Sequence, residues 1–221
     1  MLPREICYSP EMEIIPLEGN EVGALASVLK ILRDGGVVAA PTDTVYGILG
    51  DAAREGVIRK MVTLKKQSEK PLPVFVKDIA IARKYAYISD AKVKFLERVW
   101  PGPVTVLFYH KEKLPSLLTP ESDIIGLRIP QHPFLLQLLD RFDGPVAQTS
   151  ANISGKPPAT TLEEIKAYFP EGDGAPDLVV DAGTLGSRPS TVVDFKGERP
   201  MVVRTGMISP AELQKIFDAV V

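Results

Sequence analysis

Short apolar runs alternate with helical segments along the chain, and this alternation leaves few architectures open. The run Val37–Ala40 has the length of a buried strand, whereas Glu21–Arg33 repeats its apolar residues at the helical period. Gly35 and Gly36 separate the two, since glycine tolerates the left-handed conformation that often ends a helix. The repeated alternation favours one α/β domain, a mixed sheet covered by helices.

The same criteria place further elements along the chain, and prolines mark many of their boundaries. Pro101 ends one helix and Pro210 begins another, which is a favoured position for proline. We find no internal repeat and no low-complexity linker, and therefore expect a single domain over residues 1–221. Strands are predicted at 12–17, 37–40, 71–76, 104–109, 124–129, 146–149, 178–181, 191–195 and 201–204, and helices at 21–33, 53–66, 79–85, 90–100, 133–142, about 161–168 and from 210.

Composition excludes several classes of protein. The 45% hydrophobic content is ample for a core, and the net charge of -2 gives no global argument for a nucleic-acid or membrane partner. One cysteine and two histidines argue against a disulfide, a cysteine cage or a His-rich zinc site, so we expect no metal held by protein side chains. No apolar run has the length of a membrane span or a signal peptide, which predicts a soluble cytoplasmic protein.

A polar cluster follows the predicted strand at 37–40. Thr42, Asp43, Thr44 and Tyr46 place three hydroxyls and a carboxylate in five residues, next to Gly47. Strand ends of open α/β sheets bind small ligands, and glycine allows a close backbone approach. The alternative is a turn whose side chains satisfy local backbone groups.

Basic residues recur next to other predicted strands. Lys65, Lys66 and Lys70 precede a buried strand and could neutralise a polyphosphate, or they are solvated lysines at a helix end. Arg128 lies inside an apolar strand and needs an anionic partner, because an unpaired buried charge costs several kcal/mol. That partner is either an internal acid such as Asp43 or the carboxylate of a ligand.

A third set of polar residues lies in the C-terminal half. Ser150 and Asn152, in the segment Thr149–Lys156, could grip a phosphate, a ribose or a base edge. Ser190 and Arg204 add a hydroxyl and another strand-end arginine. Neither a Walker A loop nor a dinucleotide fingerprint is present, and no nucleophile elbow exists. These residues favour catalysis by positioning and charge stabilisation, as in phosphoryl or nucleotidyl transfer.

Taken together, these clusters resemble the TsaC/YrdC family of threonylcarbamoyl-AMP synthases. The resemblance covers about residues 14–206, which we take as the core of the domain. Any one motif is weak, whereas seven in the family order are specific. They are PTDTVYG from Pro41, the lysine-rich segment 65–72, WPGP from Trp100, GLRIPQHP from Gly126, TSANISG from Thr149, STVVD from Ser190 and VRTG from Val203.

The resemblance implies an activity and a fold. Members of the family condense L-threonine, bicarbonate and ATP into threonylcarbamoyl-AMP and release pyrophosphate. A separate transferase complex then passes the threonylcarbamoyl group to tRNA. The implied fold is the single-domain form of a twisted mixed sheet with a large basic cavity. Mg²⁺ would accompany ATP and be held by phosphates and water.

By the same resemblance, site residues can be carried over position by position. Threonine would contact Thr42, Tyr46, Arg128 and Ser190. ATP would contact Lys65, Lys66, Lys70, Ser150, Asn152 and Arg204. The candidates for a direct part in catalysis are Lys65, Lys66 and Arg128.

The sequence departs from the family at one position. Gln67 stands where an arginine is expected, and the segment is one residue shorter. Either Lys66 takes over the anion contact or the ATP site is weakened, because Lys and Arg are not equivalent at a bidentate site.

Two other functions compete with the synthase. A paralogue could keep the basic cavity to bind tRNA or double-stranded RNA without making the adenylate. A carbamoyl-transfer domain is the other, but in the family that activity belongs to much longer chains with zinc-finger-like cysteines. The single Cys7 argues against it.

Overall fold

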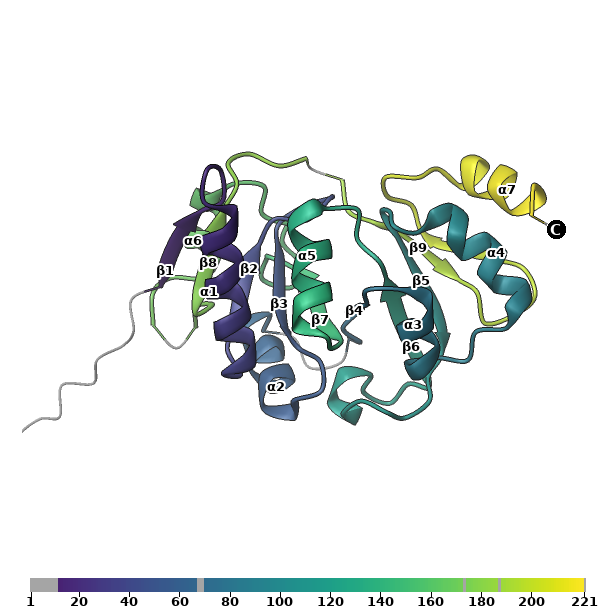
Figure 1. The fold of residues 1–221 in the computed structure, drawn as a ribbon, viewed down its shortest axis with the longest axis horizontal. Helices are drawn as coiled ribbons and strands as arrows, with labels where there is room; N and C mark the ends of the chain where they lie inside the picture. The colour runs from purple at the N-terminus through teal and green to yellow at the C-terminus, as the bar shows by residue number, and fades with distance from the viewer. Residues whose placement is uncertain (1–11, 67–69, 173, 187, 221) are drawn as a thin grey trace, which may run out of the picture.

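The structure of the chain is a computed structural model, and it describes residues 12–66, 70–172, 174–186 and 188–220. Its centre is one 10-stranded mixed sheet in the order β1-β8-β2-β3-β7-β4-β6-β5-β9-β10 (Figure 1). The predicted mixed α/β sheet is therefore confirmed. The strands are β1 (Glu13–Pro16), β2 (Val37–Ala40), β3 (Gly47–Asp51), β4 (Val74–Phe75), β5 (Val104–Tyr109), β6 (Ile124–Arg128), β7 (Val146–Ser150), β8 (Leu178–Asp181), β9 (Thr191–Asp194) and β10 (Met201–Arg204).

Seven α-helices are present in the described residues, and they flank the sheet. The helices are α1 (Glu21–Arg33), α2 (Glu55–Leu64), α3 (Ile79–Tyr85), α4 (Asp90–Val99), α5 (Pro133–Phe142), α6 (Leu162–Tyr168) and α7 (Pro210–Asp218), with a short 3₁₀ turn at Ser116–Leu118. Of the predicted helices, those at 21–33, 79–85 and 133–142 have the predicted bounds and the last begins at Pro210 as predicted, whereas the others differ by one or two residues at their ends.

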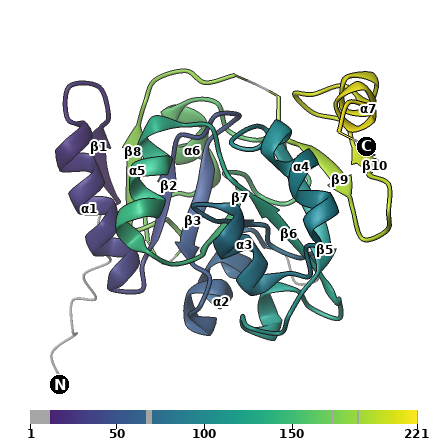
Figure 2. The same ribbon diagram turned by 45° about the vertical axis from the view of Figure 1, so that its right-hand side comes forward.

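Two groups of buried side chains hold the helices to the sheet. In one, Leu25 of α1 and Leu138 of α5 pack with Leu49 of β3. The larger group contains Phe95 of α4 and Phe217 of α7, whose ring centroids lie 6.1 Å apart. Figure 2 shows α4 and α7 beside the end of the sheet that carries β9 and β10. The apolar faces predicted from helical periodicity thus meet the sheet as expected.

Strand β3 is absent from the sequence prediction, which treats its residues as the edge of a polar loop. Gly47 and Gly50 weaken the strand signal of this segment. The structure shows why glycine is needed: a Cβ on Gly50 would lie 2.5 Å from Val57 Cγ1 and 2.8 Å from Met61 Sδ. The glycine lets α2 pack closely on β3, so the polar cluster becomes the connection between two antiparallel strands.

One predicted strand is much shorter than expected. The strand predicted at 71–76 is reduced to β4, residues Val74 and Phe75. Pro71 and Pro73 have no N–H to donate to a neighbouring strand, which limits regular pairing there. The segment instead becomes part of the wall of the cavity described next.

Candidate functional site

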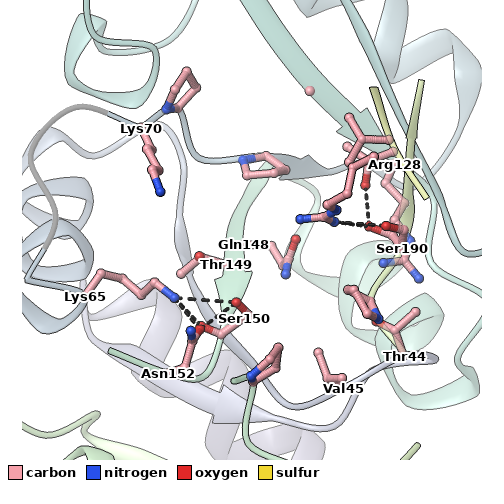
Figure 3. A pocket seen from close by; sticks show the side chains of 18 of the residues that line it. Thr44, Val45, Lys65, Lys70, Arg128, Gln148, Thr149, Ser150, Asn152 and Ser190 are labelled. Carbon is pink, nitrogen blue, oxygen red and sulfur yellow. Dashed lines mark hydrogen bonds between the residues drawn. The ribbon is translucent and has the colours of Figure 1, made fainter. Parts of the chain in front are cut away.

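A cavity of about 630 Å³ opens over the middle of the sheet (Figure 3). Strand alternation forms part of its lining: Ile124, Gly126 and Arg128 of β6 face it, whereas Ile125 and Leu127 point into the larger core. The volume is within the range of small-molecule sites. The cavity lies where segments from distant parts of the sequence converge, from Thr44 to Arg204.

The charge of the lining is one-sided. Among the described residues, the lining contains five basic side chains and no acidic one, although the whole chain has a net charge of -2. Such a lining attracts anionic ligands, because cations in a low-dielectric hollow reinforce one another's field. The basic residues are Lys65, Lys70, Arg128, Lys156 and Arg204.

Lys65 belongs to a buried cluster at one side of the cavity. Its Nζ donates to the Ser150 carbonyl at 2.8 Å and to Asn152 Oδ1 at 2.5 Å, and it lies 3.5 Å from Ser150 Oγ. Ser150 Oγ in turn donates to Asn152 Oδ1 at 2.6 Å. Figure 3 shows these three residues gathered together. The cluster holds an ammonium group with neutral oxygens, and the loosest contact, to Ser150 Oγ, is the one that an anion could replace.

The environment of Lys65 perturbs its titration. The residue is 3% exposed, and burial lowers the pKa of Lys65 from 10.5 to about 8, with a further contribution from the charge of Lys70. A negative ligand would reverse this effect, because an opposite charge favours the protonated amine. A strongly perturbed lysine in a cavity is a candidate functional residue.

Arg128 has a different environment at the opposite side. Its Nη2 donates to Asp43 Oδ1 at 2.5 Å, and its Nε donates to the Gly102 carbonyl at 2.9 Å. The side chains of Arg128 and Asp43 are 2% and 9% exposed, and the guanidinium lies 5.6 Å from the centroid of the Phe75 ring. Of the two partners left open for Arg128, the internal acid is present in the structure.

Arg204 and Ser190 complete this side of the cavity. Arg204 Nη2 donates to the Ser190 carbonyl at 2.9 Å and to Ser190 Oγ at 3.2 Å. Ser190 Oγ also shares a hydrogen bond of 3.0 Å with Thr105 Oγ1. Burial lowers the pKa of both Arg128 and Arg204. Two desolvated guanidinium groups therefore occupy the same side of the hollow.

The structure brings seven of the predicted site residues together in this one cavity. They are Lys65, Lys70, Arg128, Ser150, Asn152, Ser190 and Arg204. The roles assigned to them remain predictions, but their convergence requires the tertiary fold, since they come from the ends of five different segments.

Three predicted site residues are not among the residues that line this cavity, and the contacts assigned to them stay predictions. Tyr46 is fully buried: its hydroxyl donates to the Gly183 carbonyl and accepts from Ala182 N, both at 2.8 Å. Thr42 Oγ1 donates to the Val45 carbonyl at 2.7 Å, as the turn alternative predicts. Lys66 is exposed, because its left-handed backbone (φ 49°) turns it away after α2 ends.

Two other positions in the segments that resemble the family are His132 and Gln67. His132 precedes α5, and burial lowers its pKa. Its Nδ1 is buried and makes no hydrogen bond within the described residues. Gln67, at the departure from the family pattern, lies outside the described residues.

Sequence reasoning missed several lining residues. Gln148 shares the cavity with Ser150, two positions along β7, and Thr105 shares it with Leu107 on β5. On β5 the signal was the alternation of strand residues, which places every second side chain on one face. On β7 the consecutive residues Gln148, Thr149 and Ser150 all line the cavity, so alternation gives no such signal there. Lys156, at the end of a predicted polar segment, also lines the cavity and supplies a further cation.

The described residues show neither a metal cluster nor a membrane-spanning helix. No group of three or more His, Cys, Asp or Glu residues there could hold a metal ion. None of the helices in that part of the chain combines the length and the apolar character needed to cross a membrane.

A family model and several curated proteins that match this chain all point to the same family. A model of the Sua5, YciO and YrdC proteins, described as telomere recombination, matches residues 30–206. Threonylcarbamoyl-AMP synthase of Rattus norvegicus is 36% identical over 198 residues, which cover 84% of this chain and 69% of the rat protein. Threonylcarbamoyl-AMP synthase of Enterobacter sp. (strain 638) is 34% identical over 190 residues, covering 80% and 95%.

A solved structure extends this comparison to the fold. The Sua5 protein of P. abyssi, crystallised with L-threonine, matches with a TM-score of 0.84 and 28% sequence identity. The match covers 93% of this chain but only 60% of the P. abyssi chain. The present chain thus spans about three fifths of that longer relative.

Proposed function

Because the chain belongs to the Sua5–YciO–YrdC family, we propose that it is a threonylcarbamoyl-AMP synthase that uses L-threonine, bicarbonate and ATP. The observation that carries this proposal is the cavity, which has separate cationic clusters around Lys65 and around Arg128. One cluster suits a polyphosphate and the other a carboxylate, so both substrates can lie in one hollow.

The nucleotide is assigned to the cluster around Lys65. The ammonium of Lys65 and the hydroxyl of Ser150 supply donors of the kind that phosphates accept, with Lys70 at the same rim. Asn152 holds these two groups in place, because its Oδ1 accepts from both and its Nδ2 donates to the Ile153 and Lys156 carbonyls. A protonated Lys65 would stabilise the charge that develops on the phosphoryl oxygens. We place the ATP phosphates here on this basis, and Arg204 between the nucleotide and the amino acid.

The amino acid is assigned to the cluster around Arg128 and Ser190. A guanidinium recognises a carboxylate, and the serine hydroxyl can bond a polar group of the substrate. The threonine nitrogen attacks the carbon of bicarbonate, and the carbamate forms with loss of water. A carbamate oxygen then bonds the α-phosphorus as the bond to pyrophosphate breaks. Two clusters facing one cavity would bring these atoms together, and positioning of this kind accelerates reaction without a protein nucleophile.

Mg²⁺ is expected to arrive with ATP. The described cavity residues offer cations, hydroxyls and amides but no carboxylate, so they do not fit direct coordination of Mg²⁺. Phosphate oxygens and water are then its ligands, and no step above depends on a metal held by the chain.

Further parts of the proposal concern what happens to the product. We expect a threonylcarbamoyl transferase complex to consume threonylcarbamoyl-AMP in the modification of tRNA, in the cytoplasm. Direct binding of tRNA or double-stranded RNA to this chain is a separate hypothesis. The charge of the described cavity is suitable for it, but the net charge of the whole chain gives it no support.

The decisive experiment measures pyrophosphate release from ATP with L-threonine and bicarbonate, and omits each substrate in turn. Release that requires all three, with threonylcarbamoyl-AMP identified by mass spectrometry, supports the synthase and shows that Gln67 is tolerated. If nothing turns over while RNA binds with a salt-dependent affinity, the chain is a binding module instead.

A further inference from the structure

The buried ion pair between Asp43 and Arg128 joins two parts of the cavity wall. Asp43 lies in the connection between β2 and β3, which supplies Thr44 and Val45 to the lining, whereas Arg128 lies on β6. The two residues are 85 positions apart in the sequence. The pair therefore fixes the β2–β3 connection to strand β6, and both contribute to the cavity wall.

Both oxygens of the Asp43 carboxylate are used. Oδ1 accepts from Arg128 Nη2 at 2.5 Å, and Oδ2 accepts from the backbone N–H of Gln131 at 3.0 Å. Gln131 is close in sequence to Arg128, so the carboxylate spans the end of β6 and the residues that follow. Two donors from one segment leave the carboxylate little freedom to rotate.

The guanidinium is constrained in the same way. Nε donates to the Gly102 carbonyl, Nη2 donates to Asp43, and Arg128 Cζ lies over the Phe75 ring. These hydrogen bonds use two of the five N–H donors of an arginine. At 1% exposure Arg128 presents only a narrow edge to the cavity that it lines. A ligand must therefore meet a guanidinium whose direction is already set.

The charges at this side of the cavity also need Asp43. Arg204 is close enough to lower the pKa of Arg128, in addition to the larger effect of burial, and Asp43 opposes both. Without the carboxylate, two guanidinium groups would share a desolvated site with no acid to offset them. With it, Asp43, Arg128 and Arg204 sum to one positive charge, so the acid helps to keep Arg128 charged and in place in the buried site.

We propose that Asp43 is a positioning residue: it aims Arg128 at the carboxylate of the amino-acid substrate. The proposal rests on the function proposed above, because it assigns the amino acid to the Arg128 side. It adds a residue that touches no substrate but acts through the orientation of another.

The test compares Asp43→Asn and Asp43→Glu with a matched control. Asp177→Asn removes a carboxylate that also bonds a cation and a backbone N–H, with Lys60 Nζ at 2.6 Å and Val37 N at 2.6 Å, but Asp177 does not line the cavity. All variants are first checked for folding by thermal unfolding, and steady-state kinetics then vary L-threonine and ATP separately.

For Asp43→Asn we expect the KM for L-threonine to rise at least tenfold, with the KM for ATP changing less than threefold. Its preference for L-threonine over L-threoninamide, which lacks the carboxylate, should fall by a similar factor. Asp177→Asn should leave both KM values within twofold of the original chain. An Asp43→Asn variant with an unchanged threonine KM and preference would overturn the proposal.

Asp43→Glu separates position from charge and carries the test if Asp43→Asn does not fold. It keeps the carboxylate but displaces it by one methylene. We expect its stability to exceed that of Asp43→Asn, while the KM for L-threonine stays at least threefold raised. If the KM of Asp43→Glu for L-threonine equals that of the unsubstituted chain, only the charge of residue 43 matters and the positioning role is overturned.

The outcomes also separate this proposal from the proposed function. Turnover by the original chain with no threonine-specific effect in the Asp43 variants leaves the synthase standing and removes the positioning role. If the original chain does not turn over, L-threonine and L-threoninamide binding is measured by calorimetry on the same variants. Equal binding of the two ligands by the original chain would then overturn both.

Discussion

Lys65 and Arg128 are two buried cations that line the same cavity, but the protein stabilises them in different ways. Arg128 has a buried carboxylate partner in Asp43, whereas the hydrogen bonds of Lys65 to described residues go to neutral oxygens of Ser150 and Asn152. Burial lowers the pKa of Lys65 to about 8. The fold therefore depends on the charge of Arg128, while the charge of Lys65 is left to be stabilised by a ligand.

The largest expected effect is the loss of folding stability when the charge of Arg128 is removed. Arg128→Met should lower the free energy of unfolding by about 3–5 kcal/mol, because it leaves the Asp43 carboxylate buried and unpaired. Urea unfolding measures the change. Arg59→Met is the control, since its pair with Glu55 is exposed on both sides and should contribute less than about 1 kcal/mol. Equal losses in the two variants would show that the buried pair has no special role.

Lys65→Met should give the opposite pattern. We expect a loss of about 100-fold or more in kcat/KM for ATP, the size seen when a charge-stabilising donor is removed from an active site. The free energy of unfolding should stay within about 1 kcal/mol, because the removed charge was already destabilised by burial. Lys66→Met, at an exposed position, should change kcat/KM less than threefold. A comparable loss in Lys66→Met would mean that Lys66 reaches the phosphates.

The third prediction uses pH to sharpen the contrast. Binding of an anion favours protonated Lys65, so the affinity for ATP should be constant well below pH 8. It should fall as the pH rises above about 8, by at most about tenfold per pH unit for one linked proton. The affinity of Lys65→Met should lack this step.

The same titration has the opposite effect on stability. Between about pH 8 and the ordinary lysine pKa of 10.5, the unfolded chain binds more protons at this residue than the folded chain does. The contribution of Lys65 to stability therefore rises with pH across that interval. Calorimetric titration of ATP and urea unfolding, both over pH 7–10, test the two signs. A parallel fall of both quantities would contradict the assignment to Lys65.

The smallest expected effect is at Ser190. Ser190→Ala removes the hydroxyl that Arg204 Nη2 and Thr105 Oγ1 contact but leaves the backbone carbonyl that also accepts from Arg204. We expect the KM for L-threonine to rise about fivefold, the equivalent of a net hydrogen bond of about 1 kcal/mol. Thr63→Ala removes a hydroxyl that bonds only its own helix and should leave this KM unchanged.

The sequence predicted most of the secondary structure because the relevant signals are local. Proline and glycine boundaries and the helical period located α1, α3 and α5 with their observed bounds. Strand β3 was missed because its glycines serve packing against α2, a contact between segments that local patterns do not record. The shortening of β4 follows from prolines whose effect on pairing depends on the neighbouring strands.

The candidate site was predicted in part. Polar residues at strand ends identified the segments, but not which side chain of each segment enters the cavity. Lys65 and Lys66 are adjacent, yet one is buried in the lining and the other is exposed, because the backbone turns left-handed between them. The predicted contact of Tyr46 with threonine stays a prediction, and what the structure adds is that its hydroxyl bonds the backbone of Ala182 and Gly183, after β8.

The sequence by itself determined the alternating α/β order, the scarcity of cysteine and histidine and the set of polar segments that resemble one family. Only the tertiary structure decided the partners: Asp43 for Arg128, the Ser150 and Asn152 oxygens for Lys65, and Ser190 for Arg204. The physical reason is that these contacts join residues far apart in the chain, and a buried charge is compatible with folding only where another segment supplies its partner.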